Sequence, residues 1–270
     1  KYKCYNYTVM SLKICMLASG SKGNCTYLSD DKTSILIDIG LPYKTLAQRA
    51  KYNNIDLSGI SAVITTHCHT DHCCGLLSFT KKHDIPLYSH QKGVEHLAYK
   101  TGLDQSRISP FNKDFNIGSL TVTPFMLPHD APGCCGYSIT SGSGKISIAT
   151  DLGKAQDDVL QSIYGSDIAV MECNHDIQML IEGRYPPALK KRILSDLGHL
   201  SNNQCAAAVR RLIEKGTRKF ILAHLSQENN LPELAYNCLT QYLNESCITE
   251  GRDYSVTIAY QQKTTHIISI

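Results

Sequence analysis

The chain has 270 residues, of which 42% are hydrophobic and 19% are charged. This composition is typical of a globular protein with a substantial core, and it excludes an intrinsically disordered chain. The formal net charge of +3 is too small to indicate nucleic-acid binding by itself, so any site for a polyanion has to be a local patch.

Cysteine usage and hydropathy indicate the compartment. Neighbouring cysteines such as Cys73-Cys74 and Cys134-Cys135 are poorly suited to a disulfide framework, and no CxxC pair repeats at zinc-finger spacing. The sequence shows neither a signal peptide pattern nor an apolar stretch long enough for a membrane. We therefore expect reduced thiols, a cytoplasmic protein and no membrane partner.

The first nine residues differ from the rest of the chain. They carry no periodic pattern and precede Met10, which resembles a natural start. We expect residues 1–9 to be a disordered or non-native extension. Residues 10–270 are expected to form a single domain, because no low-complexity linker divides them.

Strand and helix patterns alternate along the remainder of the chain, which predicts an α/β fold. The predicted strands are 12–18, 25–29, 34–38, 62–66, 86–89, 119–127, 136–140, 145–150, 166–172, 219–223, 255–260 and 266–270. The predicted helices are 42–52, 75–82, 91–101, 175–182, 186–197, 202–215 and 232–245. The loop at 19–24 offers backbone N–H groups to an anion, but it lacks the Walker spacing of a specific phosphate loop.

The stretch 67–72, His-Cys-His-Thr-Asp-His, follows the strand pattern at 62–66. His67 and His69 point the same way on an extended segment, because side chains alternate with a period of two. They can hold one metal ion, while Asp71 and His72 face a second position beside it. Imidazole and carboxylate are the donors that zinc, manganese and iron accept, so two divalent ions, Zn²⁺ or Mn²⁺ with iron as a further option, are expected.

This His-x-His-x-Asp-His stretch resembles the first motif of the metallo-β-lactamase superfamily. The resemblance implies a four-layer αβ/βα sandwich with the site at one edge of two sheets. It also implies that His129 is the third histidine of the first metal, that Asp151 bridges both metals, and that His224 is the remaining histidine of the second metal. Asp38 either braces the metal loop, as is common in this superfamily, or caps a turn.

Two metals predict hydrolysis. A water shared by two divalent cations loses a proton near neutral pH, which gives a hydroxide positioned for attack. Asp71 and His199 are predicted to take part in catalysis. His199 resembles the histidine with which phosphodiesterases of the superfamily contact phosphate or protonate a leaving group.

Residues near the last strands are expected to bind substrate. These are His199 and Ser201 in the turn before the helix at 202–215, together with Asn174 and His175. Ser201 is also well placed to N-cap that helix, and His175 either lines the cleft or caps its own helix. Basic residues at 190–192, 210–211 and 215 favour a phosphate backbone, although each run is also consistent with a solvated helix face.

Four stretches, 17–24, 66–72, 172–176 and 198–202, resemble the YycJ family of bacterial metallo-hydrolases, also called WalJ. The resemblance implies a DNA substrate and a 5′-to-3′ exonuclease that is active with manganese or a similar metal. One alternative is a β-lactam-hydrolysing metallo-β-lactamase. Another is a metal-stabilised nucleic-acid-binding or regulatory module without turnover.

Overall fold

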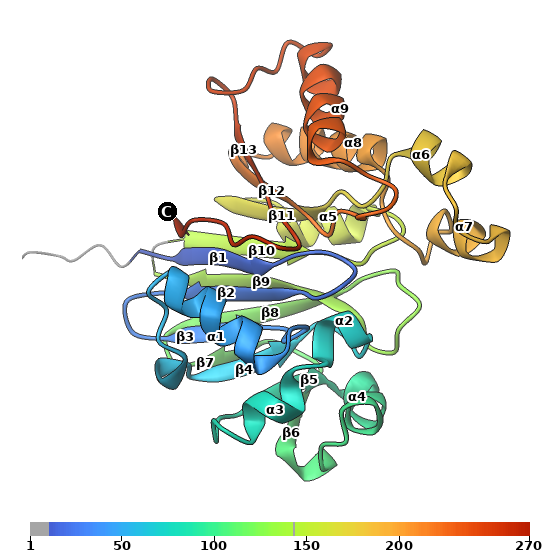
Figure 1. Cartoon of the computed structure of the whole chain (residues 1–270). Coiled ribbons are helices and arrows are strands. Elements are labelled where there is room, and N and C mark those ends of the chain that lie inside the picture. Colours follow the sequence, from blue (N-terminus) through green and yellow to red (C-terminus); the bar gives the residue numbers. More distant parts are fainter. Residues whose placement is uncertain (1–10, 143) are drawn as a thin grey trace, which may run out of the picture.

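The computed structural model describes residues 11–142 and 144–270, and the extension expected at residues 1–9 lies outside them. Two seven-stranded sheets lie at the centre, and helices cover the outer face of each (Figure 1). The predicted α/β class and the four-layer αβ/βα sandwich are confirmed.

The first sheet has the strand order β14-β1-β2-β3-β4-β5-β6. Its strands are β1 (Lys13–Ala18), β2 (Cys25–Ser29), β3 (Ser34–Ile37), β4 (Ala62–Thr65), β5 (Leu87–His90), β6 (Ile108–Phe111) and β14 (Ile268–Ser269). Neighbours from β14 to β3 pair antiparallel, whereas β3, β4, β5 and β6 run parallel. The carboxyl ends of β3 and β4 therefore lie at the same edge of the sheet.

The second sheet has the order β13-β12-β11-β10-β9-β8-β7. Its strands are β7 (Phe115–Ile117), β8 (Leu120–Met126), β9 (Cys135–Ser141), β10 (Gly144–Ala149), β11 (Ile168–Glu172), β12 (Lys219–Ala223) and β13 (Ser255–Ile258). The strands β10, β11, β12 and β13 run parallel, so the segments that follow β10, β11 and β12 also emerge together at one edge.

Helices cover the two outer faces. They are α1 (Tyr43–Tyr52), α2 (Thr70–Cys73), α3 (Leu76–Thr80), α4 (Val94–Thr101), α5 (Asp157–Ile163), α6 (Ile177–Glu182), α7 (Pro187–Ile193), α8 (Asn202–Glu214) and α9 (Pro232–Asn244). Short 3₁₀ turns occur at Leu57–Gly59, Gln91–Gly93 and Gln105–Arg107. Within 11–142 and 144–270, no helix is both long enough and apolar enough to cross a membrane.

The core explains why the central strands are almost continuously hydrophobic. Along β11, Ile168 and Val170 pack into the cluster between the sheets, whereas Ala169 and Met171 pack under the outer helices. The strand β4 is divided in the same way, with Ile64 toward the other sheet and Val63 toward the helices. Strands covered on both faces need apolar residues at every position.

Several elements differ from the prediction. The strands β6 and β7 and the helix α5 were not expected. Pro110 obscures β6, but proline is tolerated here because β6 is an edge strand. The helix predicted over 186–197 ends at Ile193, where the chain turns so that the His199 N–H reaches the Ile193 carbonyl at 3.0 Å.

Candidate metal centre

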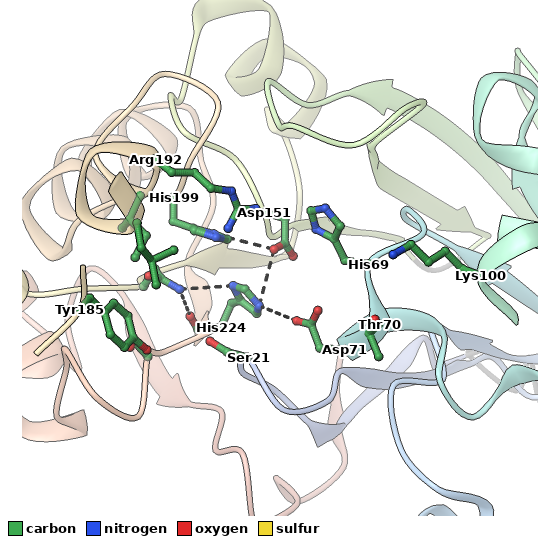
Figure 2. Close-up of a pocket in the computed structure, with 14 residues that line it drawn as sticks. Ser21, His69, Thr70, Asp71, Lys100, Asp151, Tyr185, Arg192, His199 and His224 are labelled. Carbon is green, nitrogen blue, oxygen red and sulfur yellow. Dashed lines mark hydrogen bonds and ion pairs between the residues drawn. The ribbon is translucent and has the colours of Figure 1, made fainter. Parts of the chain in front are cut away.

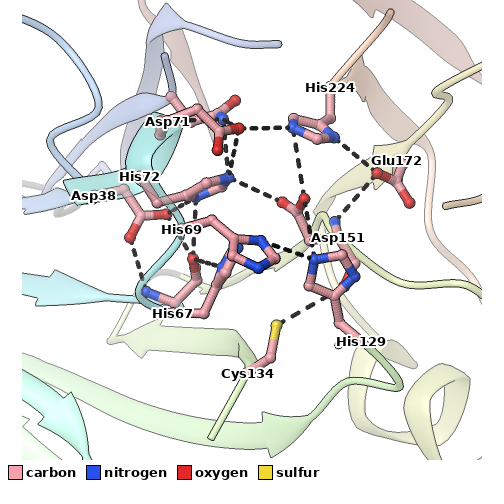
Figure 3. A network of polar contacts seen from close by, with 12 residues as sticks. Asp38, His67, His69, Asp71, His72, His129, Cys134, Asp151, Glu172 and His224 are labelled. Carbon is pink, nitrogen blue, oxygen red and sulfur yellow. Dashed lines mark hydrogen bonds and ion pairs between the residues drawn. The ribbon is translucent and has the colours of Figure 1, made fainter. Parts of the chain in front are cut away.

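The residues predicted to bind metal follow strand ends in both sheets. The first sheet presents His67 and His69 after β4, and the second presents Asp151 after β10 and His224 after β12. The loop between β8 and β9 adds His129. Figure 3 shows these side chains converging from the two sheets, so residues far apart in the sequence meet at one edge of the sandwich.

Three of the strand-end residues have left-handed backbone conformations. The φ angles are 59° at Asp38, 64° at Asp151 and 57° at His224. Such conformations are uncommon outside glycine and cost on the order of 1 kcal/mol each. At each of these residues the chain turns sharply at the end of its strand, and the side chain contacts another residue of the site.

The first histidine cluster consists of His67, His69 and His129. Each offers one ring nitrogen, and these nitrogens lie within 4.8 Å of one another. His129 Nε2 is 3.3 Å from His69 Nδ1. Nitrogens that share one tetrahedral zinc ion lie about 3.3 Å apart, so this spacing fits a common ion.

The second cluster consists of Asp71, His72 and His224. Asp71 Oδ2 lies 3.4 Å from His72 Nε2 and 3.5 Å from His224 Nε2. Asp151 stands between the two clusters, because its Oδ2 is 3.1 Å from His72 Nε2 and its Oδ1 is 3.9 Å from His129 Nε2. The structure thus brings all seven predicted ligands together, with Asp151 between the two clusters.

Buried carboxylates orient the histidines of the second cluster. His72 Nδ1 is 2.7 Å from Asp38 Oδ2, and Asp38 also accepts hydrogen bonds from the Thr66 N–H and hydroxyl. His224 Nδ1 is 2.8 Å from Glu172 Oε1. With Nδ1 of each ring bound to a carboxylate, Nε2 is the nitrogen left for a metal. Of the two roles considered for Asp38, the structure supports bracing.

The electrostatics of the two clusters differ. Burial lowers the pKa of His67, His69 and His129, which favours neutral imidazoles able to donate to a metal. Burial also lowers the pKa of His224, but the charges of Asp151, Asp71 and Glu172 outweigh it and raise that pKa to about 10. The second cluster therefore has a strongly negative potential that attracts cations.

Both clusters fit divalent metal ions. His67 Nε2 is buried and makes no hydrogen bond within the described part of the chain. A buried ring nitrogen without a partner is costly, and a bound ion removes that cost. Imidazole nitrogens with carboxylate oxygens form the donor set that zinc, manganese and iron accept.

A cavity of about 370 Å³ opens above the clusters, and we call it the metal pocket. Asp71, Asp151 and His224 line it together with His199 (Figure 2). Lys100 from α4 and Arg192 from α7 also line it, so cationic groups from both halves of the fold reach the metal pocket.

Comparisons with known proteins show the family of the chain. The model of the beta-lactamase superfamily domain matches residues 33–225. Exodeoxyribonuclease YycJ of Bacillus anthracis is 35% identical over 250 residues, which cover 92% of this chain and 95% of that protein. This chain belongs to the metallo-β-lactamase superfamily. Exodeoxyribonuclease WalJ of Streptococcus pneumoniae is 33% identical over 252 residues, covering 92% and 94% of the two chains.

The fold is shared with solved metallo-β-lactamase-fold structures. YhfI from Bacillus subtilis aligns with a TM-score of 0.72 and 17% identity, covering 97% of this chain and 100% of that protein. Together with the family model and the sequence relatives, this makes the chain a metallo-β-lactamase-fold hydrolase, homologous to YycJ and WalJ. Members of this family typically bind divalent metals, and the two clusters are the residues here that suit them.

The four residues expected to bind substrate lie in different surroundings. His199 and Asn174 line the metal pocket, and Asn174 Nδ2 donates to the His224 carbonyl at 2.8 Å. His175 is buried, and the described residues that line the metal pocket do not include it. The Ser201 hydroxyl accepts from the Gln204 N–H as part of a capping box at the start of α8. Asp176, not His175, caps α6.

Of the basic runs, only the one on α7 reaches the metal pocket. There Arg192 makes two hydrogen bonds to the Asp130 carboxylate. On α8, Arg210 pairs with Glu214 and Arg211 pairs with Asp157. The run on α8 therefore behaves as the solvated helix face that was the alternative reading.

Three residues at the site were not recognised as site residues from the sequence. Glu172 ends β11 and binds His199 and His224. Its place at a strand end, like that of the predicted ligands, is the sequence signal that could have identified it. Asn24 Nδ2 lies 3.2 Å from Asp71 Oδ2, so the loop at 19–24 serves as a brace. Lys100 had no local signal, because only the packing of α4 brings it to the metal pocket.

Proposed function

We propose that this hydrolase is a metal-dependent exonuclease that digests DNA from the 5′ end toward the 3′ end. The observation that carries the proposal is the metal pocket, where residues of both clusters lie beside the cationic side chains of Lys100 and Arg192. Homology to two proteins named exodeoxyribonucleases, at 33% and 35% identity, supports DNA as the polymer. The paired cysteines of the sequence favour the cytoplasm as the compartment.

In this proposal two divalent cations, Zn²⁺ or Mn²⁺ with iron as a further option, occupy the two clusters. His67, His69 and His129 hold one, Asp71, His72 and His224 hold the other, and Asp151 lies between them. Such cations, when bound, provide an activated water near neutral pH and neutralise charge on phosphoryl oxygens.

Asp71 has a second task in the proposed reaction. Its side-chain contacts within 11–142 and 144–270 all use Oδ2, and the side chain is 22% exposed. Oδ1 is therefore available to accept a hydrogen bond from the attacking water and to orient it toward phosphorus. Burial raises the pKa of Asp71, but His72 and His224 lower it well below its ordinary value, so the group is a carboxylate at neutral pH.

His199 is the proposed partner of the leaving group. Its Nδ1 lies 2.8 Å from Glu172 Oε1, which fixes the ring in the wall of the metal pocket. Nε2 is then the ring nitrogen left for the substrate, where it binds a phosphate oxygen or transfers a proton to the departing 3′ oxygen. Its side chain is 12% exposed, which allows contact with a substrate from the pocket.

Lys100 and Arg192 are proposed to bind the phosphates that flank the scissile bond. Arg192 is positioned by Asp130, whose carboxylate occupies two of its N–H groups. The remaining guanidinium donors are left for phosphate, which guanidinium groups bind well. Asn174, which also lines the metal pocket, adds an amide.

The test is digestion of DNA duplexes labelled at either the 5′ or the 3′ end. Metal-depleted protein is resupplied with Mn²⁺ or Zn²⁺, and Asp71→Ala, His199→Ala and the exposed control His96→Ala are assayed alongside. We expect metal-dependent release of 5′-terminal nucleotides, an inactive Asp71→Ala, a reduction of about 100-fold in His199→Ala and full activity in His96→Ala.

The same preparations are tested with a chromogenic β-lactam. Lactam turnover without cleavage of any DNA would replace the exonuclease proposal with the lactam hydrolase. Tight metal and DNA binding without turnover of either substrate would instead favour a binding module. Release from the 3′ end alone would contradict the proposed polarity.

A further inference from the structure

Two further hollows lie along the C-terminal segment, and the first of them adjoins the metal pocket. The first, of about 320 Å³, shares Ser226 with the metal pocket. The second, of about 720 Å³, shares Gln262 and Lys263 with the first. We call these two adjoining hollows the C-terminal groove, with its characteristic residues Arg49, Lys51, Tyr52, Tyr260, Lys263 and His266.

The C-terminal groove is positively charged. Arg49 and Lys51 of α1 line it on one side, and Lys263 lines it on the other. The described residues that line the two hollows include no aspartate or glutamate. Because the whole chain has a net charge of only +3, this is a local concentration of positive charge, and it leads away from the metals.

Fixed contacts hold the C-terminal side of the groove in place. The Ser19 N–H donates to the Tyr260 carbonyl at 3.1 Å, and Gln261 accepts from the Lys22 N–H at 2.7 Å and donates to the Gly23 carbonyl at 2.9 Å. Ser21 in the same loop lines the metal pocket. The segment that carries Lys263 is thus joined to the wall of the metal pocket, and Figure 1 shows the C-terminal stretch running beside β1.

The α1 side is also anchored. Arg49 Nη1 donates to the Leu17 carbonyl at 2.8 Å, which ties α1 to β1. The anchored arginine lines the second hollow, and Lys51, which also lines it, is exposed. A groove with both walls fixed needs little rearrangement to receive a ligand.

Exposed tyrosines accompany the cations. Tyr52 is 74% exposed and Tyr260 is 38% exposed, and Lys263 Nζ lies 5.4 Å from the centre of the Tyr260 ring. Alternating cations and aromatic rings are the arrangement by which proteins hold single-stranded nucleic acid, because phosphates bind the cations while unpaired bases stack on the rings. Bases paired in a duplex do not expose these faces.

We propose that the C-terminal groove binds the single strand of DNA that extends from the end being cleaved in the metal pocket. This rests on the proposed exonuclease function and adds the path of the uncleaved strand. The groove should control the affinity for long strands, whereas the metal pocket alone should suffice for a small phosphodiester.

The experiment compares the wild type with Lys51→Glu/Lys263→Glu, with Tyr52→Ala and with the matched control Lys113→Glu, an exposed lysine between β6 and β7. Full-length, Mn²⁺-loaded proteins bind a fluorescent single strand of about 16 nucleotides with phosphorothioate linkages, at several salt concentrations. Hydrolysis of bis(p-nitrophenyl) phosphate reports the metal pocket, and hydrolysis of the ordinary oligonucleotide gives kcat and KM.

We expect the double variant to bind the strand about tenfold more weakly. The slope of log affinity against log salt concentration should become shallower by about 1.4, because two phosphate contacts are lost. Tyr52→Ala should weaken binding by about fivefold or more. Both should raise KM for the oligonucleotide with kcat unchanged, and both should retain hydrolysis of the small phosphodiester. Lys113→Glu should resemble the wild type in every assay.

If the double variant binds the strand as tightly as the wild type does, the C-terminal groove does not bind DNA and the proposal is overturned. Binding of fluorescent polyglutamate is measured in the same way. If the double variant loses polyglutamate binding but retains strand binding, the groove suits an acidic protein and the proposal is overturned. If the wild type cleaves no DNA but binds the strand through Lys51 and Lys263, the exonuclease proposal fails and the groove stands.

Discussion

Glu172 links the metal centre to the residue proposed to act on the leaving group. One oxygen, Oε1, lies 2.8 Å from Nδ1 of both His199 and His224, while Oε2 accepts from the Leu152 and Leu200 N–H groups. Burial raises the pKa of Glu172, but His199 and His224 outweigh it and hold the pKa at about 2. The carboxylate is therefore charged at neutral pH and fixes both imidazoles.

Replacing Glu172 with glutamine should weaken the second metal site. In Glu172→Gln the charge is lost, and an amide N–H₂ placed at Oε2 would face two backbone donors. We expect metal affinity to fall by about 10- to 100-fold, as is typical when a partner of a metal-binding histidine is removed. Competition with a metallochromic chelator measures this, with the exposed Glu95→Gln as the control. Equal affinities in the two variants would contradict the role of Glu172.

At the scale of elements, the short helical turn α2, which follows β4, is held by the loop before β2 and by the segment that follows β3. The Asn24 N–H donates to the Asp71 carbonyl at 2.7 Å, and the Ile39 N–H donates to the His72 carbonyl at 2.9 Å. Gly40 packs directly on this turn, because a Cβ atom on it would lie 1.6 Å from the Asp71 carbonyl oxygen. The metal ligands thus depend on a close backbone contact that only glycine permits.

Gly40→Ala should displace this turn. Because the Cβ atom would overlap backbone, we expect a loss of about 1–3 kcal/mol in the free energy of unfolding, together with reduced metal affinity. Urea denaturation and metal titration measure the two effects. The control is Gly59→Ala, where the nearest atom to the added Cβ is 3.8 Å away. Similar stability and metal affinity in both variants would show that the turn tolerates the methyl group.

The helix α8 begins at a capping box formed by Ser201 and Gln204. Ser201→Ala removes the cap, so we expect the free energy of unfolding to fall by about 1 kcal/mol. Because the hydroxyl is buried and engaged with Gln204, KM for DNA should stay unchanged. Denaturation and steady-state kinetics separate the two roles, with the exposed Ser195→Ala as the control. A raised KM without a loss of stability would restore Ser201 as a substrate contact.

Across the whole molecule, the two clusters join the two sheets. The first sheet and its following turn supply His67, His69, Asp71 and His72, whereas the second supplies Asp151 and His224. Ions bound here would cross-link halves of the sandwich that are otherwise held by apolar packing. Metal binding and folding should therefore be coupled.

Removal of metal should lower the thermal stability. At about 100-fold excess over Kd, one ion bound only to the folded state adds about 2.7 kcal/mol, which corresponds to a shift in Tm of about 5–10 °C for a chain of this size. Calorimetry of chelator-treated and Mn²⁺-loaded protein measures the shift. His67→Ala should show a smaller shift than the wild type. An identical Tm with and without metal would show that the clusters hold no ion.

Local patterns in the sequence predicted the α/β class and the metal-binding stretch at 67–72. The sandwich and the roles of His129, Asp151 and His224 were implied by the resemblance to the metallo-β-lactamase superfamily. Runs of hydrophobic residues indicate strands that are buried on both faces. A histidine or aspartate directly after such a run, as at Asp151 and His224, can be found in the sequence alone. The short edge strands β6 and β7 escaped prediction, because Pro110 and half-exposed positions blur their periodicity.

The sequence by itself therefore determined the fold class, most of the elements and the types of ligand, because each depends on residue type and local spacing. Only the tertiary structure decided that Glu172 joins His199 to His224, that Lys100 reaches the metal pocket, and that Lys51 and Lys263 share one groove. These relations join residues that are distant in the chain, and chain reversals and packing, rather than local propensity, set the distances between them.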